Sequence, residues 1–192
     1  MSADKPRARL RICLDADALF AGAASVSGAS HLILQLGELG IIEVGVPEQA
    51  RAEAERNLAA KLPAALPAFR ALLEACCIGL PIVSDAESVA IAESGEADPK
   101  DAPILGSALA GGCGWLVTFN LRDYRSDRIR ISNPGDFVEA LRGELLQLGL
   151  PKPDQALAHA SAPGTASCRR GAAWPLILAG GEEPQGEGVT RT

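Results

Sequence analysis

Short apolar runs alternate with helical patterns along residues 1–150, and this alternation limits the fold more than any other feature of the chain. Runs suited to strands occupy residues 10–14, 41–46, 82–83, 115–119 and 129–131. Stretches with a helical spacing of apolar residues separate most of these runs. Strands that alternate with helices form βαβ units around a mostly parallel sheet, so the sequence predicts an α/β fold of this kind.

Capping residues and helix breakers set the ends of the predicted helices. The apolar residues of 32–39 share one wide helix face, and Gly40 is the expected stop. Asp101 is the expected N-cap of a helix that reaches Gly111. Further helices are predicted from Pro47 to about Ala60, from Pro63 to about Cys77 and from Asn133-Pro134 to about Gly149.

The composition changes near residue 150. Residues 151–192 contain 6 Gly and 5 Pro, or 11 of 42, which is typical of low-complexity, disordered segments. We therefore divide the chain into a leader at 1–8, a folded domain at 9–149 and a disordered tail at 150–192. The length of 192 residues suits one such domain with a tail.

Charge and composition exclude several classes of protein. The net charge of −6 argues against a passive nucleic-acid coat, and an aromatic content of 4% argues against a protein that stacks single-stranded bases. No apolar run has the roughly 20 residues that span a membrane, and no secretory signal is evident. Five irregularly spaced cysteines do not form a disulfide framework, and two histidines do not suit a Cys/His zinc site. We expect a cytoplasmic protein with reduced thiols.

Acidic and amide side chains recur where the predicted strands end. Sites in open parallel sheets form beyond the carboxyl ends of the strands. The residues expected there are Asp15 and Asp17 after the first strand, Glu53 in the helix after the second, Asp98 and Asp101 before a helix, and Asn120 and Asp123 after residues 115–119. Clustered carboxylates raise one another's pKa or bind a cation, and oxygen ligands suit Mg²⁺ or Mn²⁺. The pattern indicates metal-assisted phosphodiester hydrolysis.

The same acids also have structural interpretations. Asp15 and Asp101 can cap the helices that follow them, and Glu53 can lie on a solvated helix face. Arginines surround the predicted site: Arg122, Arg125, Arg128 and Arg130 follow the strand at 115–119, and Arg51 and Arg56 flank Glu53. Arginine binds phosphate in a bidentate manner. The alternative is a salt-bridged surface in which these arginines pair with Asp123 and Asp127.

Three motifs together resemble the PIN-domain ribonucleases, and most closely the VapC-like toxins of bacterial toxin–antitoxin pairs. The motifs are LDADALF, EQARAEAERNL and DPKDAPILGSALAGGCGWLVTFNLRDY, and the resemblance covers roughly residues 8–148. It implies a three-layer α/β/α fold whose central, mostly parallel sheet has about four to five strands. It also implies cleavage of single-stranded RNA by water activated on Mg²⁺ or Mn²⁺. An antitoxin that places a basic residue at the acids is the implied partner, and the 32–39 helix offers an apolar face for that contact or for a homodimer.

The resemblance also assigns roles to individual residues. Asp15, Glu53 and Asp101 match the three catalytic and metal-binding acids, Asp98 and Asp123 match further metal ligands, and Asp17, Thr118 and Asn120 match auxiliary polar positions. Arg122, Arg125 and Arg56 are the predicted contacts to RNA phosphates. Two positions depart from the family pattern. Asp17 is often Asn, and Asn120 stands where many relatives have Asp, so Asp123 has to complete the site.

Two other functions compete with this interpretation. Asp15-Ala16-Asp17 also resembles the D-x-D loop of haloacid dehalogenase-type phosphatases, in which Asp15 would attack phosphorus. That family also requires a Lys before an acidic pair, and Lys100-Asp101 matches this poorly because no strand precedes it. The third interpretation is a PIN fold that binds without catalysis, although the acids at positions 15, 53 and 101 argue against it.

Overall fold

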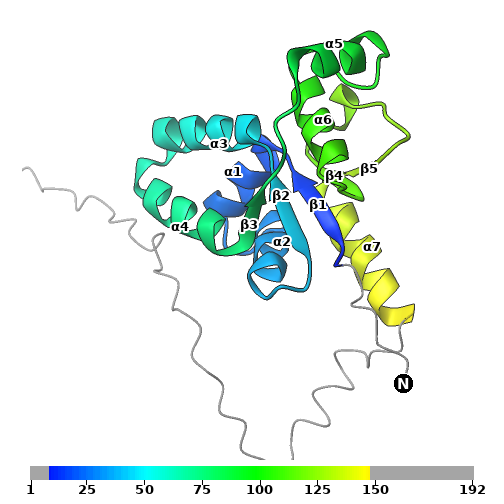
Figure 1. Cartoon of the computed structure of the whole chain (residues 1–192). Helices are drawn as coiled ribbons and strands as arrows, with labels where there is room; N and C mark the ends of the chain where they lie inside the picture. The colour runs from blue at the N-terminus through cyan, green and yellow to red at the C-terminus, as the bar shows by residue number, and fades with distance from the viewer. Residues whose placement is uncertain (1–8, 148–192) are drawn as a thin grey trace, which may run out of the picture. The chain divides into compact units, whose positions relative to one another are not determined.

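The computed structural model describes residues 9–147, and a five-stranded parallel sheet forms the centre of this part (Figure 1). The strands are β1 (Arg11–Leu14), β2 (Glu43–Val46), β3 (Cys77–Gly79), β4 (Trp115–Val117) and β5 (Arg130–Ser132). They lie in the order β3-β2-β1-β4-β5, and every neighbouring pair is parallel. The predicted α/β fold is confirmed. The predicted leader at 1–8 and tail at 150–192 lie outside the described residues.

Helices flank the sheet and connect its strands (Figure 1). They are α1 (Ala16–Ala24), α2 (Ala29–Glu38), α3 (Glu48–Lys61), α4 (Leu66–Cys76), α5 (Asp85–Glu93), α6 (Ala102–Ala110) and α7 (Pro134–Gln147). Short 3-10 turns, η1 (Pro63–Ala65) and η2 (Leu121–Asp123), lie before α4 and after β4. Gly40 has a φ of +67° just after α2, which is the left-handed stop that the sequence predicts.

The edge of the sheet differs from the prediction. The strand expected at residues 82–83 is absent from the described chain, and Ile82 is 82% exposed. The edge strand is instead β3, whose Cys77 pairs with Val44. The prediction placed Cys77 at the end of the preceding helix because the apolar spacing of α4 continues into this three-residue strand. Helix α5 was also missed, because none of its residues is buried and its sequence has no apolar period.

The core lies between the three inner strands of the sheet and the helices around them. Leu14, Val44 and Leu116 are fully buried on β1, β2 and β4, because strands inside a parallel sheet are covered on both faces. The Trp115 and Phe137 rings meet edge to face with centroids 5.3 Å apart, so α7 is fixed against β4.

No single helix within residues 9–147 is long and apolar enough to cross a membrane. Helices α1 and α2 reach the required length and composition only when taken together, and they are bent by 90° at the break between them. Both helices contribute fully buried residues to the core, among them Leu19, Ile33 and Leu34.

The order in which the chain adds strands to the sheet reverses beside β1, and this reversal positions the site. From β1 the chain passes through α1 and α2 to β2 on one side, and it later returns to β4 on the other side. In open α/β sheets, ligands bind in the crevice beyond the carboxyl ends of strands at such a point. Residues that directly follow Leu14 and Val117 therefore occupy the candidate site.

Candidate functional site

Asp15 directly follows the carboxyl end of β1 and is only 6% exposed. Its backbone N–H donates to the carbonyl of Val117 at 3.0 Å, which ties the end of β1 to the end of β4. One carboxylate oxygen, Oδ1, accepts a hydrogen bond of 2.6 Å from the backbone N–H of Ala16, so Asp15 caps α1 as one interpretation of the sequence expected.

Two hydroxyl groups hold the other oxygen of Asp15. Thr118 Oγ1 donates to Asp15 Oδ2 at 3.0 Å, and the Tyr124 hydroxyl donates to the same atom at 2.9 Å. Burial and the charge of Asp15 raise the pKa of Tyr124, so its phenol stays protonated as a donor. Sequence reasoning had selected Thr118 and had missed Tyr124. The available signal was its position directly after Asp123.

Asp17 also faces the end of β4. Its Oδ2 accepts a hydrogen bond of 3.1 Å from the backbone N–H of Phe119, and Thr118 Oγ1 lies 3.4 Å from each of its carboxylate oxygens. Burial, and next the charge of Asp15, raise the pKa of Asp17 to about 6. Asn120 is exposed, and its backbone N–H donates to Thr118 Oγ1 at 3.0 Å. Thr118 therefore contacts both Asp15 and Asp17, whereas Asn120 joins this group only through its backbone N–H.

Asp98, Asp101 and Asp123 form a second group, which we call the acid cluster. One oxygen of each carboxylate lies within 4.8 Å of the others. Backbone hydrogen bonds set this arrangement, because the N–H of Asp98 donates to the carbonyl of Asp123 at 2.9 Å and the N–H of Asp101 donates to the carbonyl of Asp98 at 2.8 Å. An isolated antiparallel bridge between Ala97 and Tyr124 holds the same two segments together.

Two cations neutralise the acid cluster. The Lys100 ammonium lies 3.3 Å from Asp123 Oδ2 and 3.4 Å from Asp101 Oδ2, and the Arg125 guanidinium lies 3.3 Å from Asp98 Oδ1. Burial raises the pKa of Asp101, Lys100 opposes that rise, and the charges of Asp15 and Asp123 add to it. The neighbouring carboxylates of Asp123 and Asp101 raise the pKa of Lys100. Sequence reasoning had not placed Lys100 in the site, although it stands between two selected acids.

Asp101 does not cap α6 with its side chain, contrary to that interpretation of the sequence. It occupies the N-cap position, but its backbone is helical there and its carboxylate accepts no capping hydrogen bond. Instead, Asp101 Oδ2 is buried and accepts no hydrogen bond from the residues at 9–147. A buried carboxylate oxygen carries a large desolvation penalty, and here the Lys100 ammonium at 3.4 Å offsets part of it.

Glu53 lies apart from the acid cluster in this structure. It is exposed on α3 and is not one of the three carboxylates that approach within 4.8 Å. One turn earlier, Gln49 Nε2 donates to the backbone carbonyl of Lys100 at 2.8 Å. Residues four apart share a helix face, so Glu53 projects from the face of α3 that contacts the Asp98–Asp101 loop. Its role as a ligand stays a prediction.

The arginines make ion pairs, but not with the predicted partners. Arg125 pairs with Asp98, Arg128 with Glu96, Arg130 with Glu144 and Arg51 with Glu55. Arg122 and Arg56 are exposed and make no ion pair with any residue that the structure describes. These two cations are thus available to an anionic ligand.

The carboxylates, taken together, suit a hard cation. The acid cluster offers only oxygen ligands, its buried Asp101 Oδ2 already has a cation beside it, and Asp15 is close enough to raise the pKa of Asp101. Magnesium and manganese prefer such ligands, whereas zinc sites usually contain nitrogen or sulfur. The residues present therefore fit a Mg²⁺ or Mn²⁺ ion.

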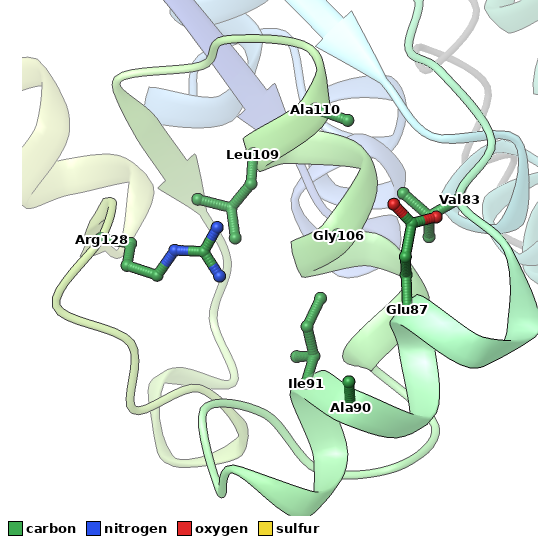
Figure 2. Close-up of a pocket in the computed structure, with 8 residues that line it drawn as sticks. All are labelled: Val83, Glu87, Ala90, Ile91, Gly106, Leu109, Ala110 and Arg128. Carbon is green, nitrogen blue, oxygen red and sulfur yellow. The ribbon is translucent and has the colours of Figure 1, made fainter.

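A separate pocket of about 360 Å³ lies between α5 and α6 (Figure 2). Its lining is mostly apolar, with Arg128 and Glu87 as the charged members. It contains neither Asp15 nor any member of the acid cluster. The candidate site is therefore distinct from this pocket.

Comparisons with known proteins agree with this geometry. The sequence model of the PIN domain family matches residues 11–122. Among solved structures, VapBC2 from Rickettsia felis, bound to a DNA fragment from its promoter, contains a chain with 13% identity and a TM-score of 0.50; the match covers 64% of this protein and 98% of that chain.

Two further solved structures resemble the fold less closely. The protein PAE2754 from Pyrobaculum aerophilum has 19% identity and a TM-score of 0.49, over 68% of this protein and 88% of that chain. DNA-bound VapBC from Salmonella typhimurium contains a chain with 20% identity and a TM-score of 0.47; the match covers 65% of this protein and 98% of that chain. No curated protein matches the sequence.

Proposed function

Because the chain belongs to the PIN domain family, whose members are generally nucleases, we propose that it is a metal-dependent endoribonuclease that cleaves single-stranded RNA. The observation that carries the proposal is the acid cluster beside Asp15 at the carboxyl edge of the sheet. Phosphodiester hydrolysis needs a group that neutralises charge at phosphorus and a group that prepares a water molecule. This edge of the sheet offers ligands for the first and carboxylates for the second.

Asp15, Asp98, Asp101 and Asp123 would hold Mg²⁺ or Mn²⁺, and Glu53 would join them from α3. When bound, such an ion supplies Lewis-acid activation of water and stabilises the negative charge of the leaving oxygen. Thr118 and Tyr124 fix the orientation of Asp15 through its Oδ2. Asp15 Oδ1 accepts only the hydrogen bond from Ala16, so one lone pair of this oxygen is left for a metal ion in a fixed orientation.

Asp101 is our candidate for the group that orients the attacking water and accepts its proton. The Lys100 ammonium lies 3.4 Å from the buried Oδ2 of Asp101, so a water molecule would take that place once the ammonium has moved. Burial raises the pKa of Asp101, and a raised pKa makes a carboxylate a better base near neutral pH. Arg122, Arg125 and Arg56 are the proposed contacts to the phosphates of the RNA.

We further propose that the protein is the toxin of a toxin–antitoxin pair and acts in the cytoplasm. The four cysteines in the described part are free thiols, as expected in a reducing compartment. An antitoxin would cover the acids with a basic side chain of its own. Leu32 and Leu39 on or next to α2 are 40% and 73% exposed, and they offer an apolar contact to that antitoxin or to a second copy of the chain.

The testing experiment is cleavage of a mixed single-stranded RNA by the purified full chain. We expect cleavage with Mg²⁺ or Mn²⁺, none with EDTA, and none by Asp15→Ala. Glu139→Gln is the matched control, because Glu139 is 72% exposed and pairs only with Arg142 at 3.8 Å. Cleavage that persists in EDTA or in Asp15→Ala would contradict the proposal.

The same samples test the two alternatives. Hydrolysis of a small phosphate ester without any effect on RNA would favour the phosphatase, in which Asp15 is the nucleophile. The structure gives that alternative little support, since Lys100 and Asp101 precede α6 and do not end a strand. An absence of both activities and of Mn²⁺ binding would favour a PIN fold that only binds partners.

A further inference from the structure

Lys100 places its ammonium inside the acid cluster although most of its side chain is exposed. The side chain is 69% exposed, yet its Nζ lies 3.3 Å from Asp123 Oδ2 and 3.4 Å from Asp101 Oδ2. An extended lysine would reach solvent instead. The ammonium therefore occupies the space between two carboxylates in which a divalent cation would need to bind.

The backbone around Lys100 is held independently of its side chain. Gln49 on α3 donates to the Lys100 carbonyl, and the neighbouring N–H of Asp101 donates to the Asp98 carbonyl. The loop can therefore keep its shape when the ammonium moves. Lysine has a flexible four-carbon stem, so Nζ can leave the cluster through rotation of the side chain alone.

We propose that Lys100 is an internal counter-ion of the acid cluster, which competes with the divalent metal and leaves the carboxylates when the metal binds. This inference rests on the proposed function, because it concerns the same ligands. A +1 ammonium and a +2 ion cannot share the space between Asp101 and Asp123, since like charges at a few ångströms repel strongly. Within the acid cluster the Arg125 guanidinium pairs with Asp98 alone, so it can remain when the metal enters.

A metal titration tests the competition. Binding of Mn²⁺ is measured by calorimetry on the full chain as wild type, as Lys100→Met and as the control Arg142→Met. Arg142 is 62% exposed and, among the described residues, forms an ion pair only with Glu139, so its substitution removes the same charge away from the site. We expect Lys100→Met to bind Mn²⁺ about threefold to tenfold more tightly than the wild type, and Arg142→Met to bind within about twofold of it.

A second measurement follows the ammonium itself and needs no substitution. The chain has four lysines, at positions 5, 61, 100 and 152, so acetylation at each can be followed by peptide mass spectrometry. Mn²⁺ should raise the acetylation rate of Lys100. Lys61 is the internal control, because its ammonium lies 5.2 Å from the Phe20 ring and away from the acids; its rate should not change.

The outcomes separate this inference from the proposed function. Equal or weaker Mn²⁺ binding by Lys100→Met, with clear binding by the wild type, would overturn the counter-ion and leave the metal site intact. A Lys100 acetylation rate that Mn²⁺ lowers or leaves unchanged would overturn it too. Failure of every variant to bind Mn²⁺ would overturn the metal-dependent nuclease and the counter-ion together. Binding by Lys100→Met alone would support strong competition.

Discussion

The negative charges of Asp15 and of the acid cluster are stabilised in different ways. Asp15 is buried and receives hydrogen bonds from the neutral groups of Ala16, Thr118 and Tyr124. The acid cluster is partly exposed and is balanced by the cationic side chains of Lys100 and Arg125. Neutral donors hold the Asp15 carboxylate in a fixed orientation, whereas the long cationic side chains beside the acid cluster can be exchanged for another cation.

This contrast indicates that Asp15 and the acid cluster have different roles at the candidate site. A carboxylate that is fixed by packed hydroxyls gives the site its geometry, because the donors are themselves buried. Carboxylates that are balanced by mobile charges give the site its capacity to take up and release an ion.

Asp101→Asn should have the largest effect, on activity and not on folding. The amide keeps the shape of the side chain but removes a metal ligand and the proposed proton acceptor. We expect metal-dependent RNA cleavage to fall about 100-fold or more, with unfolding free energy changed by less than about 1 kcal/mol. Initial cleavage rates and urea unfolding are the measurements. Activity within a few-fold of the wild type, in a preparation free of other nucleases, would contradict the assignment.

Tyr124→Phe should affect folding as well as activity, because it removes a buried donor to Asp15. We expect a loss of unfolding free energy of about 1–2 kcal/mol, since the other partner stays buried and charged. Cleavage should fall about tenfold as Asp15 loses one of its two hydroxyl contacts. Urea unfolding and cleavage rates measure both. Unchanged stability would show that Thr118 alone holds Oδ2.

Asp17→Asn should stabilise the metal-free protein in a pH-dependent manner. The pKa of Asp17 is raised from its ordinary value of 3.8 to about 6, so ionisation of Asp17 disfavours the folded state. The stability that its protonated form contributes is complete below about pH 4 and is lost as pH rises through about 6. After allowance for its partial exposure, the variant should be more stable by about 1 kcal/mol at about pH 8.

The control for Asp17→Asn is the same comparison at low pH. Thermal unfolding with EDTA at about pH 4 should give nearly equal stabilities, because both side chains are then neutral. An equal gain at low and high pH would assign the effect to hydrogen bonding and not to the ionisation of a buried Asp17 beside Asp15.

Arg125→Gln should have the smallest effect. The guanidinium is 59% exposed and pairs with Asp98 at 3.3 Å, and such surface pairs contribute less than about 1 kcal/mol. We expect unfolding free energy within about 0.5 kcal/mol of the wild type and at most a modest weakening of RNA binding. Chemical unfolding and RNA retention on a filter are the measurements. A loss of unfolding free energy as large as that of Tyr124→Phe would show that Arg125 is a structural partner of Asp98 and not an exchangeable cation.

The central strands could be predicted from the sequence because burial on both faces makes them continuous apolar runs. The end of the predicted strand at 10–14 therefore also located Asp15, whereas Thr118 lies inside the predicted strand at 115–119 and was indicated only by the family resemblance. The edge could not be predicted in this way. Strand β3 has only three residues, and helix α5 buries none, so neither leaves a periodic signal. For α5 the capping pair of Ser84 and Glu87 was the better signal.

The candidate site was also predicted only in part. Sequence spacing indicated that Asp98, Asp101 and Asp123 belong together, and they do lie together. The contacts of Lys100 and Tyr124 depend on side-chain directions between segments that are distant in sequence, and no local pattern encodes such directions. The placement of Glu53 as a ligand depends on the same kind of contact and stays a prediction.

The backbone bridge between Ala97 and Tyr124 has a thermodynamic consequence. Hydrogen bonds from Asp98 N–H to the Asp123 carbonyl and from Arg125 N–H to the Glu96 carbonyl join two segments that α6 and β4 separate along the chain. Any local opening that breaks this bridge also separates the acids. Ion binding and closure of the bridge are therefore linked equilibria: each must strengthen the other by the same factor.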